Sequence, residues 1–280
     1  MLPMRAPARL ITLSLALLGA GAGAALATSE SVSASSGNVS ARLTYVHSPK
    51  SVVAPFSDLY LTIARAGKSI YGAPVSNTAC GNECWPNVPD ALRVLDVEAD
   101  GEPDVLLNLY TSGAHCCNAT DVFRYDAARN SYLGVLHVWG DPGYSLRRLD
   151  GSKPYEFVTA DDRFAYEFAA YAYSGLPIEI LRLRGDAFLD VTPSYPKLVA
   201  GDAAEQWRSY RENEGAGFGL GFLAAWAADE YSLGRRSAVA GTLARLERSG
   251  GLYNEPGAPW TGGAKFVTRL EQFLDKYGYS

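Results

Sequence analysis

Oxygen-bearing side chains in one short stretch before an apolar run could bind a hard cation. The stretch reads Asp96-x-Glu98-x-Asp100-Gly101-Glu102-x-Asp104. Its carboxylates stand at the first, third, fifth and ninth positions, with glycine at the sixth. Ca²⁺ takes several oxygen ligands, and a loop of this spacing supplies them, the seventh residue through its backbone carbonyl. The sequence therefore predicts a calcium site built from Asp96, Glu98, Asp100, Glu102 and Asp104.

The loop differs from an EF-hand in two ways. Its twelfth position is Leu107, where an EF-hand has a bidentate glutamate. A strand-like pattern follows at residues 105–110, where that motif has a helix. The alternative to a cation site is a polar turn between strands, closed by hydrogen bonds from aspartate side chains to the local backbone.

The chain has four cysteines: Cys80, Cys84, Cys116 and Cys117. In an exported chain such cysteines are usually paired. A bond between the adjacent Cys116 and Cys117 needs a distorted peptide link, which favours crossed pairing with Cys80 and Cys84. The local pairs, Cys80 with Cys84 and a vicinal bond, remain an alternative. A zinc site using His115 has no CxxC spacing behind it.

Asp161-Asp162-Arg163 is the best candidate for chemistry beyond the loop. Adjacent carboxylates beside aromatic residues could bind a sugar, or raise one pKa for acid catalysis. Asp161 and Asp162 are therefore the weak catalytic candidates. The alternative is a turn in which Arg163 neutralises one aspartate and the following aromatic residues fill the core, the usual role of rings at strand spacing. The sequence contains no HExxH, G-x-S-x-G or P-loop motif.

The N-terminal residues indicate export. Arg5 and Arg9 precede an apolar run and a small-residue tail that ends at Ala27, as in a secretory signal peptide with cleavage after residue 27. The run is short for a membrane span, so no stable membrane anchor is expected. Removing Arg5 and Arg9 takes the formal net charge from −5 to −7. An acidic chain argues against nucleic acid as a partner, leaving an unknown extracellular ligand or protein.

The remaining chain reads as antiparallel β-structure followed by helices, an α+β class. Residues 28–40 lack periodic pattern and are predicted to be a disordered lead-in. Residues 41–197 are predicted to form a β-region, with strands at 42–47, 59–65, 105–110, 121–125, 132–139, 155–159, 164–168 and 178–183. Residues 198–280 are predicted to form a helical region, with helices at 203–211, where Asp202 is the expected cap, 220–233, 238–248 and 263–277.

A weaker copy of the Asp96 loop follows about 50 residues later. Leu149-Asp150-Gly151 and Pro154-x-Glu156 echo Asp100-Gly101 and Pro103-Asp104. A period of this size with several strands per unit is typical of propeller-like blades. Most carboxylates are missing from the second copy, so a cation is expected only in the first. Residues 41–90 could be a third unit.

The Asp-rich loop, its apolar strand and SGAHCC resemble the FG-GAP or VCBS-type repeat of secreted bacterial proteins. VTADDRFAYEF, LDVTPSYP and GLGFLAAWAADEYSLGRR are similar to an uncharacterised family of exported, actinobacterial-type proteins. The resemblance implies an extracellular, blade-like β-region that binds calcium through Asp96, Glu98, Asp100 and Asp104, and it brings no known reaction.

Two function classes follow from the sequence. The first is a secreted or cell-envelope binding protein, stabilised by calcium and disulfides and without a catalytic motif. The second is a secreted hydrolase that acts on polysaccharide or peptidoglycan through Asp161 and Asp162. Convergence of these carboxylates in an open cleft favours the enzyme, and their engagement at strand ends favours the binding protein.

Overall fold

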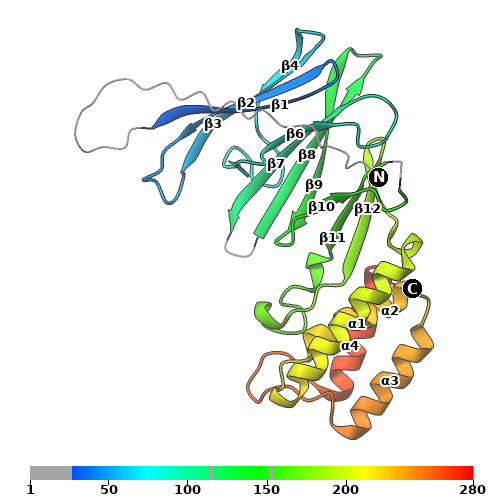
Figure 1. The fold of residues 1–280 in the computed structure, drawn as a ribbon. Coiled ribbons are helices and arrows are strands. Elements are labelled where there is room, and N and C mark those ends of the chain that lie inside the picture. The colour runs from blue at the N-terminus through cyan, green and yellow to red at the C-terminus, as the bar shows by residue number, and fades with distance from the viewer. Residues whose placement is uncertain (1–26, 114–115, 152–153, 280) are drawn as a thin grey trace, which may run out of the picture. The chain divides into compact units, whose positions relative to one another are not determined.

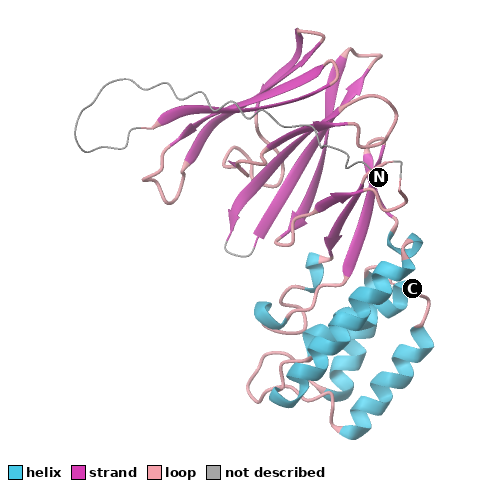
Figure 2. Cartoon of the chain, in the orientation of Figure 1, coloured by secondary structure: helices cyan, strands magenta, loops and turns pink. Residues whose placement is uncertain are grey.

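The computed structural model describes residues 27–113, 116–151 and 154–279. The chain divides after Asp141 into two compact units. Strands make up the first unit, and the second combines a small sheet with helices (Figure 1, Figure 2). The predicted α+β class, with antiparallel strands before helices, is confirmed. Among the described residues, no helix is long and apolar enough to cross a membrane.

Two antiparallel sheets form the first unit. One is a meander of four strands: β1 (Thr28–Ser36), β2 (Val39–His47), β3 (Phe56–Arg65) and β4 (Lys68–Pro74). In the other, β7 pairs on one side with the short β5 and β6 and on the other with β8, which pairs with β9. Their bounds are Trp85–Pro86 for β5, Leu92–Leu95 for β6, Asp104–Gly113 for β7, Cys116–Asp126 for β8 and Ser131–Gly140 for β9.

One hydrophobic core joins the two sheets of this unit. Leu59, Leu61 and Ile63, at alternate positions of β3, all point into it, as expected of a strand with one buried face. Strand β7 is different, because consecutive side chains on both of its faces are 0% exposed: Val105, Leu106 and Leu107. A strand whose two faces are both buried reads as a continuous apolar run, and this accounts for the sequence of β7.

The prediction of a disordered lead-in at residues 28–40 is wrong. Strand β1 occupies most of that range and pairs with β2 from Thr28 opposite His47 to Ser36 opposite Val39. Val32 and Ala34 pack against the core on alternate positions. As an edge strand with one partner, β1 buries few side chains, so its polar sequence lacks the apolar pattern by which strands are recognised.

The second unit begins with a meander of four strands and continues with helices. The strands are β10 (Ser145–Arg147), β11 (Glu156–Ala160), β12 (Ile178–Arg184) and β13 (Ala187–Asp190). The helices are α1 (Pro196–Asn213), α2 (Leu220–Ser232), α3 (Arg236–Ser249) and α4 (Gly263–Lys276). Short 3₁₀ turns lie at Asp162–Phe164, Tyr171–Tyr173, Thr192–Ser194 and Glu214–Ala216.

The helices bury their apolar faces against one another and against the segment before β12. Phe266, Leu270 and Leu274 form an apolar stripe along α4, and all three are at most 1% exposed. Phe164 and Phe168, from the segment before β12, pack into the same cluster. The four helices therefore share one core with the chain that precedes them.

Two local predictions for this unit are wrong. Residues 164–168 form no strand; a 3₁₀ turn at Asp162–Phe164 leads into them, with Phe164 and Phe168 both directed into the helical core. Asp202 does not cap α1, because the helix already begins at Pro196, whose fixed φ and missing N–H suit a first helical position. The Asp202 carboxylate instead accepts from the backbone N–H of Ile178 at 3.2 Å.

Apart from the short β5, which pairs with β7, the described strands form three meanders of four: β1–β4, β6–β9 and β10–β13. Propellers close with about four to eight blades. Three meanders, divided between two units, do not constitute a closed propeller in the described part of the chain.

Candidate functional site

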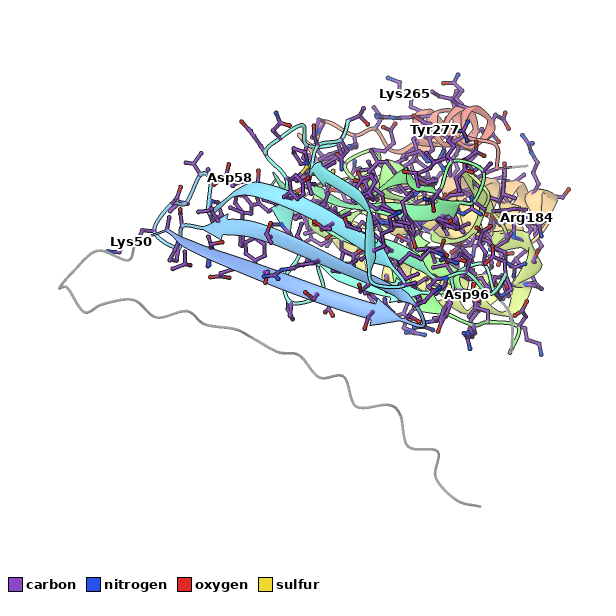
Figure 3. All side chains as sticks on the ribbon, turned by 90° about the horizontal axis from the view of Figure 1, so that it is seen from above. Lys50, Asp58, Asp96, Arg184, Lys265 and Tyr277 are labelled. Carbon is purple, nitrogen blue, oxygen red and sulfur yellow. A yellow bond between two sulfur atoms is a disulfide. The ribbon has the colours of Figure 1, made fainter. Side chains whose placement is uncertain are left out.

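The Asp96 loop is closed by hydrogen bonds to its own backbone. Asp96, labelled in Figure 3, follows β6, and its carboxylate oxygens accept from the N–H groups of Asp100 at 3.1 Å and Gly101 at 2.9 Å. Asp100 accepts from the N–H of Glu102 at 2.9 Å. Gly101 has a φ of 93°, which glycine adopts without steric cost. These bonds are those of the polar turn that was the alternative to a cation site.

Arginines from neighbouring strands form ion pairs with the two glutamates of this loop. Glu98 forms an ion pair with Arg124 of β8. Both terminal nitrogens of Arg65, on β3, donate to Glu102, one of them at 2.7 Å. Over the part of the chain that the structure describes, no three His, Cys, Asp or Glu side chains come together as a group that could hold a metal ion. The predicted ligands do not fit Ca²⁺ as they stand, and calcium binding stays a prediction.

Asp104, the ninth position of the loop, is a buried carboxyl. Its side chain accepts from the N–H of Val97 at 3.1 Å, and the residue is 4% exposed. Burial raises the pKa of Asp104 to about 7, with Glu98 and Asp100 raising it further and the Val97 N–H and Arg124 opposing the shift. The buried carboxyl of Asp104, at the end of the loop, therefore anchors the backbone of Val97 near its start.

The raised pKa predicts how stability varies with pH. Because Asp104 titrates near 7 when folded and near 3.8 when unfolded, the folded state binds more protons between these values. The free energy of unfolding should therefore fall as pH rises through that window. Asp104→Asn keeps an acceptor for Val97 and stays neutral, so we expect it to exceed wild type by about 1–3 kcal/mol at high pH and to match it in acid. Urea unfolding at pH 4, 6 and 8 measures this, and parallel profiles for the two proteins would contradict it.

Thermal unfolding of wild type and Asp100→Ala, each with calcium or with chelator, tests the calcium prediction. Since Glu98 is held by Arg124 and Asp100 by the loop backbone, we expect the same midpoint for each protein in both conditions. A rise with calcium in wild type that Asp100→Ala abolishes would instead establish the site predicted from the sequence.

The weaker copy of the loop has the same construction. Leu95 pairs with Asp104 across the β6–β7 hairpin, and Arg147 pairs with Glu156 across β10–β11. In each hairpin the buried acid accepts from a backbone N–H seven residues earlier, 2.9 Å away in the case of Glu156 and Leu149. The echo in sequence thus has a counterpart in hairpin geometry, with Glu156 in the place of Asp104.

Glu156 is neutralised by an arginine. It is 0% exposed, and Arg182 of β12 donates to it through Nε at 3.1 Å and through Nη2. The same guanidinium donates to the hydroxyl of Tyr195 at 2.8 Å. The second loop is therefore held by an internal ion pair.

The cysteine pairing differs from the crossed arrangement that the spacing favours. Cys80 and Cys84 are bonded to each other, with their Cα atoms 5.1 Å apart. The two residues lie on a short loop before β5, beside an isolated β-bridge between Asn77 and Gly81. His115 and the side chain of Cys116 lie outside the described residues.

Asp161 is fully engaged at the end of β11. It is 3% exposed and accepts from Arg163 through the backbone N–H, Nε at 2.7 Å and Nη2 at 2.6 Å. The hydroxyl of Tyr279, near the C-terminus, donates to it at 2.7 Å. Asp162 begins the 3₁₀ turn. The structure therefore matches the structural alternative for Asp161, a carboxylate neutralised by Arg163 at a strand end.

Glu179 of β12, which no motif in the sequence marks, is a further acid whose pKa is affected by the charges of Asp161 and Arg163. Burial raises the pKa of this half-buried carboxyl to about 7, and the Asp161 charge adds to the rise while Arg163 opposes it. Asp190 raises it slightly further. The signal in the sequence is an acid between Ile178 and Ile180, inside an otherwise apolar strand.

Comparison with known proteins gives distant relatives and no family. No family model and no solved structure matches the chain, so the FG-GAP or VCBS resemblance is not confirmed. Uncharacterized protein y4bJ of Sinorhizobium fredii is 28% identical over 134 residues, covering 47% of this chain and 20% of the relative. Probable thylakoid lumen protein sll0997 of Synechocystis is 30% identical over 165 residues, covering 51% and 44%. The chain thus matches less than half the length of either relative.

Proposed function

We propose that this chain is an exported binding protein without catalytic activity, acting outside the cytoplasm or in the cell envelope. The observation that supports the proposal most is the burial and hydrogen bonding of Asp161. The best catalytic candidate in the sequence is buried and accepts four hydrogen bonds from Arg163 and Tyr279. A carboxylate held in this way stabilises the fold and has little capacity left to transfer a proton.

Export is supported by three independent observations. The first residues have the pattern of a signal peptide. The bond between Cys80 and Cys84 is of a kind that persists in oxidising compartments. One of the relatives is named as a probable thylakoid lumen protein. Calcium is left out of the proposal, because Glu98 and Glu102 are paired with arginines.

A binding screen joined to an activity assay tests the proposal. The purified protein is incubated with polysaccharides and with peptidoglycan, and both retention and the release of soluble reducing ends are measured. We expect retention on one class of polymer with no release above a buffer control. Release that grows with protein concentration would contradict a purely binding role.

The hydrolase remains the second candidate because of Glu179. A carboxyl with a pKa of about 7 beside a carboxylate is a pairing that supports general acid catalysis. If the protein is a hydrolase of this type, Glu179→Gln abolishes the release of reducing ends while leaving retention intact. Because Glu179→Gln is isosteric, the fold should be kept. Circular dichroism then checks that a loss of activity is not caused by unfolding.

A further inference from the structure

Asp229 of α2 is a buried carboxyl that lies against a second acid. It is 1% exposed, on a helix face where Ala225 and Ala228 are also buried. The carboxyl of Asp202, on α1, lies within hydrogen-bonding distance of it. As a carboxylate, Asp229 has one oxygen, Oδ2, without a hydrogen-bond partner among the described residues. Two carboxylates in contact, one of them shielded from water, repel each other strongly, so full ionisation of the pair is unfavourable.

The two acids lie where three elements of the second unit meet. Asp202 accepts from the backbone N–H of Ile178, the first residue of β12, at 3.2 Å, and the same N–H is a hydrogen-bond donor to Asp229. Gln206, one turn after Asp202 on α1, donates through Nε2 to the carbonyl of Leu176 at 3.1 Å and to Asp202 at 3.4 Å. Helices α1 and α2 lie side by side (Figure 1). The carboxyl pair thus joins α1, α2 and the start of β12.

The charged side chains with the largest effect on Asp229 are Asp202 and Glu230, and both are acids. Of the other neighbours, β12 carries Glu179 next to Ile178, and the Tyr171–Tyr173 turn carries tyrosines. Arginines on the surrounding elements have acidic partners of their own: Arg235 pairs with Glu230, Arg236 with Asp275, Arg163 with Asp161, Arg208 with Glu205 and Arg211 with Glu214. A proton is therefore the positive charge best placed to balance the pair.

We propose that Asp202 and Asp229 share one proton and form a pH-sensitive latch, which holds α1 and α2 on the start of β12 while the proton is bound. With the proton in place one acid donates to the other, and the remaining carboxyl oxygens accept from the Ile178 N–H and from Gln206. Loss of the proton leaves two negative charges in contact inside the fold, and their repulsion separates α2 from α1. The latch is closed in acid and at neutral pH, and it opens under alkaline conditions.

The pH range of the latch follows from the same surroundings. Burial raises the pKa of Asp229 to about 10, with the charge and hydrogen bond of Asp202 adding to the rise and the Ile178 N–H opposing it. In the unfolded chain the group titrates near 3.8, so the folded state holds the extra proton between these values. The stability that the latch contributes is complete below the lower value and is lost as pH rises towards the upper one. This range extends above the pKa values of Asp104 and Glu179, which are about 7.

Infrared spectroscopy of the full chain at pH 9 tests the shared proton. Asp104 and Glu179 are ionised at that pH, so wild type is expected to keep the stretching band of one protonated carboxyl. Asp229→Asn, whose amide donates to Asp202 in place of the proton, should lose this band. Glu230→Gln, which removes the next acid on α2, is the matched control and should keep it. Absence of the band in wild type, or its survival in Asp229→Asn, would overturn the inference.

Urea unfolding at pH 5 and pH 9, followed by the circular dichroism of the helices, tests the latch itself. Helices α1–α4 all belong to the second unit, so their signal reports on the unit that contains the pair. Between the two pH values the urea midpoint of wild type should fall by about 1 M more than that of Asp229→Asn, which has no proton to lose at this position. Glu230→Gln should follow wild type. Equal shifts in wild type and Asp229→Asn would overturn the latch, and if Asp229→Asn does not fold, the wild-type infrared band at pH 9 decides.

Discussion

Arg182→Met is expected to reduce the free energy of unfolding by about 3–5 kcal/mol, the range for removing one partner of a buried ion pair. Glu156 is 0% exposed, and Arg182 provides both of the guanidinium bonds that neutralise it. Without Arg182 the carboxylate keeps the Leu149 N–H and the Tyr195 hydroxyl as partners but loses its counter-charge, so it must remain charged in the core or take up a proton. Urea unfolding at neutral pH, followed by circular dichroism, measures the loss.

Two controls separate this effect from a general loss of charge. The double variant Glu156→Gln with Arg182→Met removes both charges and should recover a large part of the stability, since replacing a whole buried pair is often nearly neutral. Arg235→Met breaks a pair with Glu230 in the same unit in which the arginine side chain is 52% exposed, and it should cost less than about 1 kcal/mol. Equal losses for Arg182→Met and Arg235→Met would contradict the role given to Glu156.

Phe164→Ala is expected to destabilise the protein by about 3–5 kcal/mol, as other deletions of buried rings do. Phe164 is 1% exposed and packs edge-on against Phe273 of α4, with ring centroids 4.8 Å apart, and against Tyr279 at 5.8 Å. The cavity would lie where the Asp161 turn meets the helices. Chemical denaturation measures the loss.

A conservative change at the same position gives the control for this prediction. Phe164→Leu keeps most of the apolar volume and should cost well under half as much as Phe164→Ala. A loss below about 1 kcal/mol for Phe164→Ala would contradict the placement of this ring in the core.

Apolar periodicity in the sequence predicted most of the elements correctly. Leu59, Leu61 and Ile63 alternate because one face of β3 is buried, and Phe266, Leu270 and Leu274 recur at helical spacing because one face of α4 is buried. The prediction of a strand at residues 164–168 was wrong because periodicity reports burial and does not identify the kind of element. Phe164 and Phe168 are buried, but by the helical core, and the pattern does not say which partner covers them.

The candidate site depended on contacts that spacing does not encode. Glu102 meets Arg65 across 37 residues, and Asp161 meets Tyr279 across 118. The oxygen spacing from Asp96 to Asp104 is that of a cation loop, yet these partners determine whether its carboxylates are available. The equivalence of Glu156 and Asp104 was present in the sequence echo, but the burial of both acids follows from hairpin register and became visible only in the fold.

The unfolding free energy of Asp161→Asn relative to wild type tests most directly whether this carboxylate holds the fold or serves chemistry. The change removes the charge that Arg163 and Tyr279 bind, so a structural role predicts a loss of about 2–3 kcal/mol. Asp275→Asn, in an exposed pair with Arg236, should lose less than about 1 kcal/mol and is the matched control. An Asp161→Asn protein as stable as wild type or more stable, as expected for a residue kept for catalysis at the expense of stability, would contradict the account.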